Sequence, residues 1–322
     1  MFIQFLILIF GFTLLILGAN ALVNGASGIA KKFNIPEILI GLTIVALGTS
    51  LPELVVTIVS ALTNSTDIVV GNVIGSNLCN LLLILGVVTT IKPLKFEKDS
   101  IKINLPLLNI LTILVILMGL GIFSDNVLTL NKTHGIILLI IALIYFLYPI
   151  IQYVKTKKDS NKQGNEDISN TNNINIIKCI ISIIFGIIAL KYGGDFVVNS
   201  ATNIANLFNI PERIISLTIV ALGTSLPELI TSVVSIIKND DDIAEGNIIG
   251  SCIINFCLIL GLGAFITNLT LTTAYIEDLL LLLASCIIIW LYGFGNKNHT
   301  LSRIDGLVLI SIYLIYSVRL FI

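Results

Sequence analysis

Thirteen residues that combine a carboxylate, hydroxyls, a glycine and a proline occur twice in this chain. The two copies, LTIVALGTSLPEL, are residues 42–54 and 217–229, and they lie 175 positions apart. Each copy carries one glutamate, Glu53 or Glu228, in a stretch that is otherwise apolar enough to cross a membrane. A charge at the centre of a bilayer costs roughly 2.5–3.5 kcal/mol on insertion scales. Two such carboxylates are best explained by a polar ligand that binds between two halves of the chain.

The same motif contains residues that interrupt a helix. Pro52 has no N–H group to donate to the carbonyl of Gly48, so we expect a break in the helix at this point. Irregular backbone at membrane depth is tolerated where it is buried or lines a polar cavity, and the freed carbonyls can then serve as ligands. Thr49 and Glu53 lie four residues apart and share a helix face, with Ser50 beside it. The corresponding residues of the second copy are Thr224, Ser225 and Glu228.

A second polar pattern follows each copy of the motif. Asn72, Ser76 and Asn80 recur every four residues, and their counterparts are Asn247, Ser251 and Asn255. A single serine or a pair of glycines in such a helix is explained by helix packing alone, whereas the two glutamates are not. Together these residues offer carboxylate, hydroxyl, amide and carbonyl oxygens. An all-oxygen set of this kind suits Na⁺, Ca²⁺ or Mg²⁺ and not zinc or copper.

The composition is that of a membrane protein. Of 322 residues, 56% are hydrophobic and only 11% are charged, with a mean hydropathy of +1.03. A soluble domain has about a quarter of its residues charged. The net charge of −1 argues against a nucleic-acid partner, and we expect no cofactor and no obligate protein partner. The cysteines are scattered and His134 and His299 are expected in loops, so the sequence does not predict an enzyme with intramembrane zinc.

Apolar segments of roughly 20 residues are long enough to span a bilayer. The sequence predicts an all-α protein with ten such segments, which are residues 3–29, 38–62, 68–90, 104–123, 134–154, 174–205, 213–237, 243–267, 274–293 and 303–321. The polar stretch 155–173 is expected to be a flexible linker. It separates a first five-helix repeat (1–154) from a second (174–322), with interrupted helices 2 and 7.

The lysines and arginines predict the orientation of these segments. Loops on the side of the linker hold most of them, whereas the opposite loops hold only Lys132, Arg213 and Arg319. The positive-inside rule therefore places the linker in the cytoplasm and both termini outside. Because each half has an odd number of crossings, the two halves must be inverted, as in secondary transporters. Lys191 lies within the sixth segment, and Asp195 is expected near the membrane interface.

ALGTSLPEL followed by GNVIGS, and ALGTSLPEL followed by GNIIGS, resemble the two α-repeats of the cation/calcium exchanger superfamily, in particular its compact prokaryotic sodium/calcium exchangers. The resemblance covers essentially the whole chain and implies Na⁺/Ca²⁺ antiport by alternating access. It implies that Glu53 and Glu228 are the main Ca²⁺ ligands, shared with Na⁺. It implies that the Na⁺ sites are completed by Thr49, Ser50, Ser76, Thr224, Ser225, Ser251 and the carbonyls of Ala46 and Ala221. The first and sixth helices would slide across the core, with Gly18, Asn24, Gly193 and Asn199 as small contacts.

One position departs from the family pattern. Members often carry an aspartate where this chain has Asn255, opposite an asparagine such as Asn80. The formal charge of the site then falls from −3 to −2, which balances one Ca²⁺ but not three Na⁺. H⁺/Ca²⁺ antiport, or antiport of another divalent cation, therefore remains an alternative, in which the glutamates titrate. A channel would need a continuous polar pathway, and an intramembrane protease would need an aspartate pair that the sequence lacks.

Overall fold

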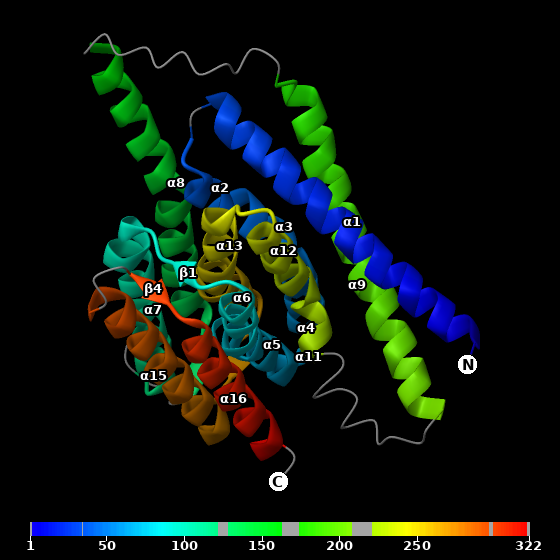
Figure 1. Ribbon diagram of the computed structural model, residues 1–322. Coiled ribbons are helices and arrows are strands. Elements are labelled where there is room, and N and C mark those ends of the chain that lie inside the picture. Colours follow the sequence, from blue (N-terminus) through cyan, green and yellow to red (C-terminus); the bar gives the residue numbers. More distant parts are fainter. Residues whose placement is uncertain are drawn as a thin grey trace.

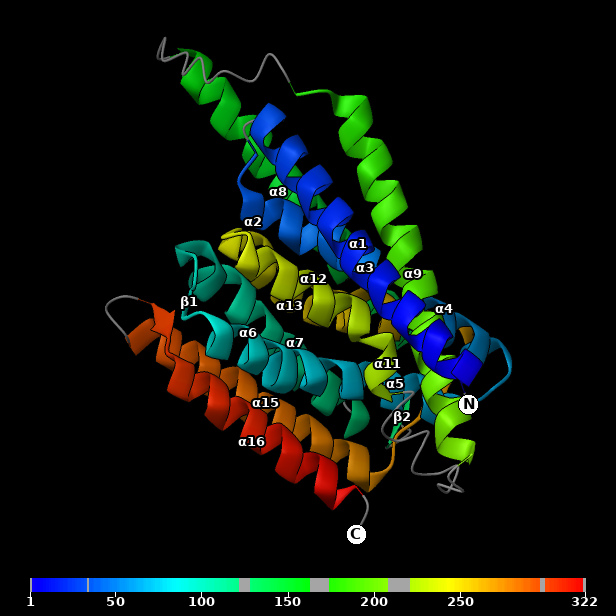
Figure 2. The ribbon, with the colours of Figure 1, turned by 45° about the vertical axis from the view of Figure 1, so that its right-hand side comes forward.

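The computed structural model describes residues 2–33, 35–121, 128–162, 174–207, 221–295 and 299–320. These residues form helices almost throughout, apart from four strands of two residues each. Figures 1 and 2 show a bundle in which two long helices, α1 and α9, lie together along one side of the remaining helices.

The elements follow one another in two comparable series. The first series is α1 (Phe2–Phe33), α2 (Glu37–Ile40), the π-helix η1 (Gly41–Val45), α3 (Ala46–Thr49), α4 (Leu51–Leu62), α5 (Thr66–Leu78), the π-helix η2 (Cys79–Ile84), α6 (Leu85–Ile91), β1 (Leu94–Lys95), the π-helix η3 (Ser100–Asn104), α7 (Leu105–Gly119), β2 (Thr129–Leu130) and α8 (Lys132–Lys162). The second series is α9 (Ile176–Leu207), α11 (Ala221–Thr224), α12 (Leu226–Ile237), α13 (Asp241–Ile254), the π-helix η6 (Asn255–Leu260), α14 (Gly261–Ile266), β3 (Leu269–Thr270), α15 (Thr273–Gly295), β4 (Thr300–Leu301) and α16 (Arg303–Arg319).

Several of these helices can cross a membrane. Within the described ranges, six are long and apolar enough, or seven if the bent pair Glu37–Thr49 and Leu51–Leu62 counts as one span. The six spans are Ile3–Phe33, Thr66–Ile91, Ser100–Gly119, Ile176–Ser200, Asp241–Ile266 and Thr273–Gly295. Large apolar side chains are exposed along Ile3–Phe33, Ile176–Ser200 and Thr273–Gly295, as expected of surfaces that face lipid, whereas Thr66–Ile91 and Asp241–Ile266 are mostly buried. The prediction of a helical membrane protein is confirmed at this level, and the count of ten crossings stays a prediction.

The helix break predicted at the first motif is present. α3 ends at Thr49 and α4 begins at Leu51, and the two parts of this span are bent by 48°. Ser50 stands at the break with φ −83° and ψ 8°, and Ser225 has nearly the same conformation, φ −90° and ψ 5°, between α11 and α12. Pro52 occupies the first turn of α4, where its missing N–H leaves no hydrogen bond unmade. Both motif copies therefore have a helix break at a serine three residues before the glutamate.

The two halves of the chain are interleaved. β1 pairs antiparallel with β4, and β2 pairs antiparallel with β3, so each short ladder joins one half to the other. α13 of the second half packs against α2, η1 and α3 of the first. One apolar cluster contains buried residues from both halves, among them Leu42, Val73, Ile249 and Phe256. The motif copies are thus held inside one shared core.

Helices α1 and α9 form an antiparallel pair with very close backbones (Figures 1 and 2). A Cβ atom added to Gly18 would lie 2.9 Å from the backbone nitrogen of Leu190, and one added to Gly193 would lie 2.9 Å from that of Leu15. Only glycine permits such an approach. The expectation that Gly18 and Gly193 contact the core is therefore wrong, because both lie in the seam between α1 and α9.

The five cysteines are free, and all except Cys179 are buried, as is usual for thiols that pack as small apolar side chains. His134 was expected in a loop, but α8 begins at Lys132 and includes this residue, which is fully buried. The hydrophobic pattern starts later than the helix because the first turn of α8 is polar.

Candidate cation site

The two motif glutamates are buried, and each meets the serine of the other copy. Glu53 and Glu228 are each 1% exposed and lie in the first turn after their helix breaks. Ser50 Oγ donates to Glu228 Oε1 at 2.9 Å, and Ser225 Oγ donates to Glu53 Oε1 at 3.5 Å. The two contacts are equivalent, because Ser225 lies 175 positions after Ser50 and Glu228 lies 175 positions after Glu53. The structure therefore brings the two copies of the motif together.

Several of the predicted ligand oxygens are buried without a hydrogen-bond partner. They are Glu53 Oε2, Glu228 Oε2, Asn80 Oδ1, Asn255 Oδ1 and Ser251 Oγ. Each buried polar atom left unpaired costs about 1–3 kcal/mol. None of the ion pairs found among the described residues involves either glutamate. A bound cation would satisfy these oxygens, so the donor set fits such a ligand.

The predicted hydroxyl ligands are divided between the two sides of the site. Thr49 Oγ1 lies 3.0 Å from Asn247 Oδ1 and 3.2 Å from the carbonyl oxygen of Ala46. The same carbonyl accepts a hydrogen bond from Ser50 N at 3.0 Å. Ser76 Oγ lies 3.3 Å from Ser225 Oγ and competes with Glu53 Oε1 for the single hydroxyl hydrogen of Ser225. The hydroxyls of Ser50, Ser76 and Ser225 therefore each contact a motif serine or a motif glutamate.

Two further predicted ligands belong to the second break. Thr224 ends α11 and lines a cavity beside the motif, whereas Ala221 begins α11 and its side chain lies outside the described ones. The carbonyl of Ala221 remains a candidate by its equivalence to Ala46 alone.

Asn72 and Asn247 hold the backbone of the motif. Asn72 Nδ2 donates to the carbonyl oxygen of Glu53 at 3.2 Å, and Asn247 Nδ2 donates to that of Glu228 at 3.2 Å. The same two amides contact a second pair of hydroxyls, Thr57 Oγ1 at 3.4 Å and Ser232 Oγ at 2.9 Å. Sequence reasoning missed these last two residues, although each lies one helical turn after a motif glutamate.

Asn80 and Asn255 stand in π-helical segments that follow α5 and α13. η2 packs against α12, which carries Glu228, and η6 packs against α4, which carries Glu53. Asn255 Nδ2 donates to Asn77 Oδ1 at 3.0 Å, so its own Oδ1 is directed elsewhere and has no partner. Asn77 was missed because the repeat has Cys252 at the equivalent position, and only the paired residues drew attention. π-helical turns are frequent at functional sites because they shift a side chain out of the regular helical register.

The chemistry of the assembled groups is that of a hard cation site. The described residues contain no cluster of three or more His, Cys, Asp and Glu side chains that could hold a metal ion. With two carboxylates, the remaining ligands must be hydroxyl, amide or carbonyl oxygens. Oxygen ligands of this kind suit Na⁺ and Ca²⁺, which accept flexible geometries with mixed neutral and charged donors.

Comparisons with known proteins identify the family of the chain. Residues 3–153 and 178–322 match the family described as sodium/calcium exchanger protein. The chain is 31% identical over 356 residues to the sodium/calcium exchanger MaX1 of Methanosarcina acetivorans, covering 99% of each chain. It is 34% identical over 267 residues to the inner membrane protein YrbG of Escherichia coli, covering 81% of this chain and 79% of that one. A structure of the sodium-calcium exchanger NCX_Mj, soaked with Na⁺ and Ca²⁺, superposes with a TM-score of 0.81 at 27% identity and covers 97% of each chain.

Proposed function

The chain belongs to the sodium/calcium exchanger protein family, and we propose that it is a secondary active antiporter that uses Na⁺ to move Ca²⁺ across the cell membrane. The observation that carries this proposal is the pair of buried glutamates with crossed serine contacts and unpaired oxygens. Two carboxylates neutralise one Ca²⁺, and the same oxygens can hold Na⁺ when Ca²⁺ is absent. Competition of the two ions for one set of ligands is what couples their movements.

We assign the ligands as follows. Glu53 and Glu228 bind Ca²⁺ directly and are shared with Na⁺, because they carry the charge of the site. The hydroxyls and the unpaired amide oxygens complete the Na⁺ and Ca²⁺ shells. These additional ligands are Thr49, Ser50, Ser76, Asn80, Thr224, Ser225, Ser251, Asn255 and the carbonyls of Ala46 and Ala221.

The proposal includes an inverted repeat of two five-helix halves, residues 1–154 and 174–322, joined by a cytoplasmic linker, 155–173. Its support is that hydrogen bonds occur in matched pairs at the offset of 175 positions. Asn72 to Glu53 matches Asn247 to Glu228, and Ser50 to Glu228 matches Ser225 to Glu53. Ten crossings, with both termini outside, give the two motifs opposite directions through the membrane. The excess of lysine on the linker side favours that orientation.

H⁺/Ca²⁺ antiport is the second candidate, and Asn255 is the residue that favours it. An asparagine at this position leaves the site with two carboxylates, so three Na⁺ would bring one positive charge in excess. Protonation of the two glutamates would instead balance the site without an excess charge. The two functions differ in the driving ion and not in the position of the site.

Flux measurements on reconstituted protein separate these functions. Vesicles loaded with Na⁺ should take up Ca²⁺ when diluted into Na⁺-free buffer, and Glu53→Gln or Glu228→Gln should abolish the uptake. Gradients of Na⁺, K⁺ and H⁺ are imposed separately at the same membrane potential. Uptake that follows the H⁺ gradient and ignores Na⁺ would overturn the leading proposal and support the second.

A further inference from the structure

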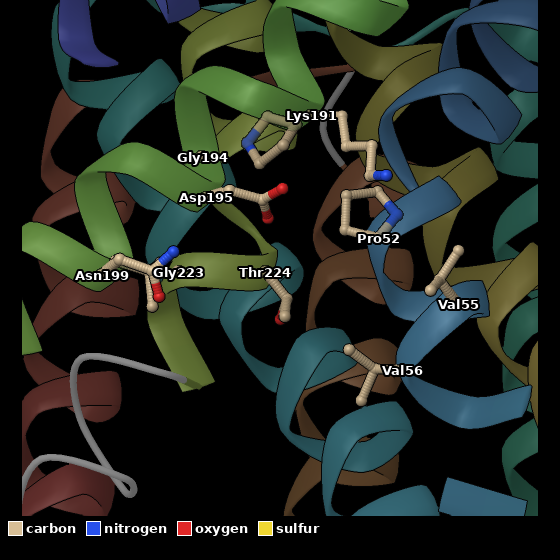
Figure 3. Close-up of a pocket in the computed structure, with 11 residues that line it drawn as sticks. Pro52, Val55, Val56, Lys191, Gly194, Asp195, Asn199, Gly223 and Thr224 are labelled. Carbon is tan, nitrogen blue, oxygen red and sulfur yellow. The ribbon is translucent and has the colours of Figure 1, made fainter. Parts of the chain in front are cut away.

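A cavity of about 210 Å³ lies between α9 and the two helix breaks. Its lining includes Pro52, Lys191, Asp195, Asn199, Thr224 and Pro227. Figure 3 shows Asp195, Asn199 and Thr224 around this space, with Pro52 on the opposite wall. Because Thr224 belongs to the second motif copy, the cavity reaches the proposed cation site from the side of α9.

We propose that Asp195, with Asn199, forms a recruiting site for the incoming cation in this cavity, and that Lys191 limits its strength. The inference rests on the proposed function, because it concerns the path to the same ligands. Lys191 and Asp195 are the ionisable residues of the cavity lining and lie one helical turn apart on α9. Both are exposed, and neither has an ion-pair partner among the described residues. Lys191 Nζ lies 5.3 Å from the centroid of the Tyr192 ring, so the two charges act on an ion in the cavity with only each other as an opposing charge in its lining.

This charge pattern does not follow from the repeat. At the offset of 175 positions, Asp195 and Asn199 correspond to Asn20 and Asn24 on α1. There, Lys238 Nζ donates to the carbonyl oxygen of Asn20 and to Asn24 Oδ1, so a cation of the protein itself contacts these two asparagines. Lys191 corresponds to Ile16, which is apolar. The charged pair Lys191 and Asp195 is therefore particular to α9, because the equivalent positions of α1 are Ile16 and Asn20.

The recruiting effect depends on the charge of the ion. A carboxylate raises the local concentration of cations near it, and low-dielectric walls focus its field. At an effective dielectric constant of about 30, between the values for a protein surface and for water, a single charge roughly 8 Å away (one Debye length at physiological salt) changes the concentration of a divalent ion roughly fivefold and that of a monovalent ion roughly twofold. Lys191 opposes this effect with a charge of the other sign. The balance of the two residues then sets the apparent affinity for Ca²⁺ more than that for Na⁺.

Right-side-out and everted membrane vesicles test the proposal by measuring Na⁺-dependent Ca²⁺ exchange from each side. We expect Asp195→Asn to raise the KM for Ca²⁺ roughly fivefold from the side on which the cavity opens and to leave the KM on the other side unchanged. The KM for Na⁺ on the cavity side should rise roughly twofold. Lys191→Gln should lower the Ca²⁺ KM by a similar factor, and the double variant should return it toward the original value. Each shift should shrink when ionic strength is raised with choline chloride.

Two controls make the result specific. Asp195→Glu keeps the charge and should keep the KM, whereas Asp67→Asn removes the same charge from an exposed position outside the cavity and should change it less than twofold. A KM that is unchanged in both Asp195→Asn and Lys191→Gln would overturn the proposal, as would an equal change on both sides. If Asp195→Asn does not fold, Lys191→Gln still tests the proposal, because its Ca²⁺ KM must fall on the cavity side. Loss of Na⁺-driven exchange in the unsubstituted protein would instead overturn the proposed function.

Discussion

Lys238, at the end of α12, donates a hydrogen bond to Asn24 on α1, with 2.8 Å between Nζ and Oδ1. The same ammonium group donates to the carbonyl oxygen of Asn20 at 3.2 Å, so α1 is tied to a motif helix at this end. At the equivalent place on the other side, Lys238 is replaced by Thr63, and Asn199 lines the cavity beside α9. The two ends of the α1–α9 pair therefore differ: one is bonded to the helix that carries Glu228, and the other borders an open space.

Removal of the Lys238 side chain should weaken the attachment of α1 to α12 at this end. Burial lowers the pKa of Lys238, and the nearby carboxylate of Asp240 opposes this shift. Because the ammonium group is partly exposed, we expect Lys238→Met to destabilise the attached state of α1 by about 1 kcal/mol. The population of the state in which α1 is detached from α12 should then rise roughly fivefold. Ser27 on α1 is 7% exposed, so a Ser27→Cys reporter in a chain without the native cysteines should be labelled faster by a thiol reagent.

Lys238→Arg is the control for this measurement, because arginine keeps the charge and the donors. Its labelling rate should stay near that of the parent chain. Equal labelling of the methionine variant and the parent would show that the contact does not hold α1 in place.

The motif serines should affect Na⁺ more than Ca²⁺. Ser50→Ala and Ser225→Ala each remove a hydroxyl that contacts a glutamate of the other repeat, but leave both carboxylates. A hydrogen bond to a charged group contributes about 1.5–3 kcal/mol, so we expect the half-saturating Na⁺ concentration to rise roughly tenfold or more. The KM for Ca²⁺ should change less, since the glutamates supply most of its binding.

A buried serine elsewhere provides the comparison. Ser285 in α15 donates to the carbonyl oxygen of Leu281 and to no motif residue. Ser285→Ala should leave both ion dependences unchanged in the same exchange assay. If Ser50→Ala and Ser225→Ala behave like Ser285→Ala, the two hydroxyls are packing residues and not ligands.

Asn255→Asp should change how Na⁺ binding depends on concentration. A third carboxylate brings the formal charge of the site to −3, which balances three Na⁺, so the Hill coefficient for Na⁺ should rise. The change also removes the donor to Asn77 Oδ1, and the Asn77 amide must turn to offer its own N–H groups. Asn77→Ala in the same background removes that constraint and should not lower the coefficient. An unchanged Hill coefficient in Asn255→Asp would contradict the argument from charge balance.

The sequence predicted the parts of the site that stand out chemically within an apolar chain. Glu53, Glu228 and the break before each could be found because charge and proline are costly in a transmembrane helix. Thr57, Ser232 and Asn77 could not, because a hydroxyl or amide there has many possible partners and only the folded chain selects one. The buried carboxylate of Glu245 was also missed. It accepts a hydrogen bond from Glu97 N at 2.9 Å, and Glu97 lies outside the repeated motifs, so the repeat could not identify it as the partner.

The long helices illustrate the same limit. Glycines at positions 11, 18 and 25 of α1 and at 186 and 193 of α9 recur every seven residues, which indicates a close helix contact but does not identify the partner. The core was the expected partner, whereas the structure pairs the two helices with each other. A glycine stripe specifies only that something approaches the backbone, and the approaching surface is set by tertiary packing.

The close seam predicts that α1 and α9 move as one unit and tolerate no added atom between them. In Gly18→Ala the new Cβ would lie 2.9 Å from Leu190 N, and in Gly193→Ala it would lie 2.9 Å from Leu15 N. Since backbone atoms cannot turn aside, each variant should be destabilised by about 1–3 kcal/mol, less up to about 1 kcal/mol gained in helix propensity. Thermal unfolding in detergent should show similar losses for both, because the two positions are equivalent in the repeat. Gly295, at the end of α15, has nothing within 4 Å of such an atom, so Gly295→Ala should not lower the unfolding temperature. An unfolding temperature that stays unchanged in Gly18→Ala would mean that the helices separate easily, and each would then be free to move alone.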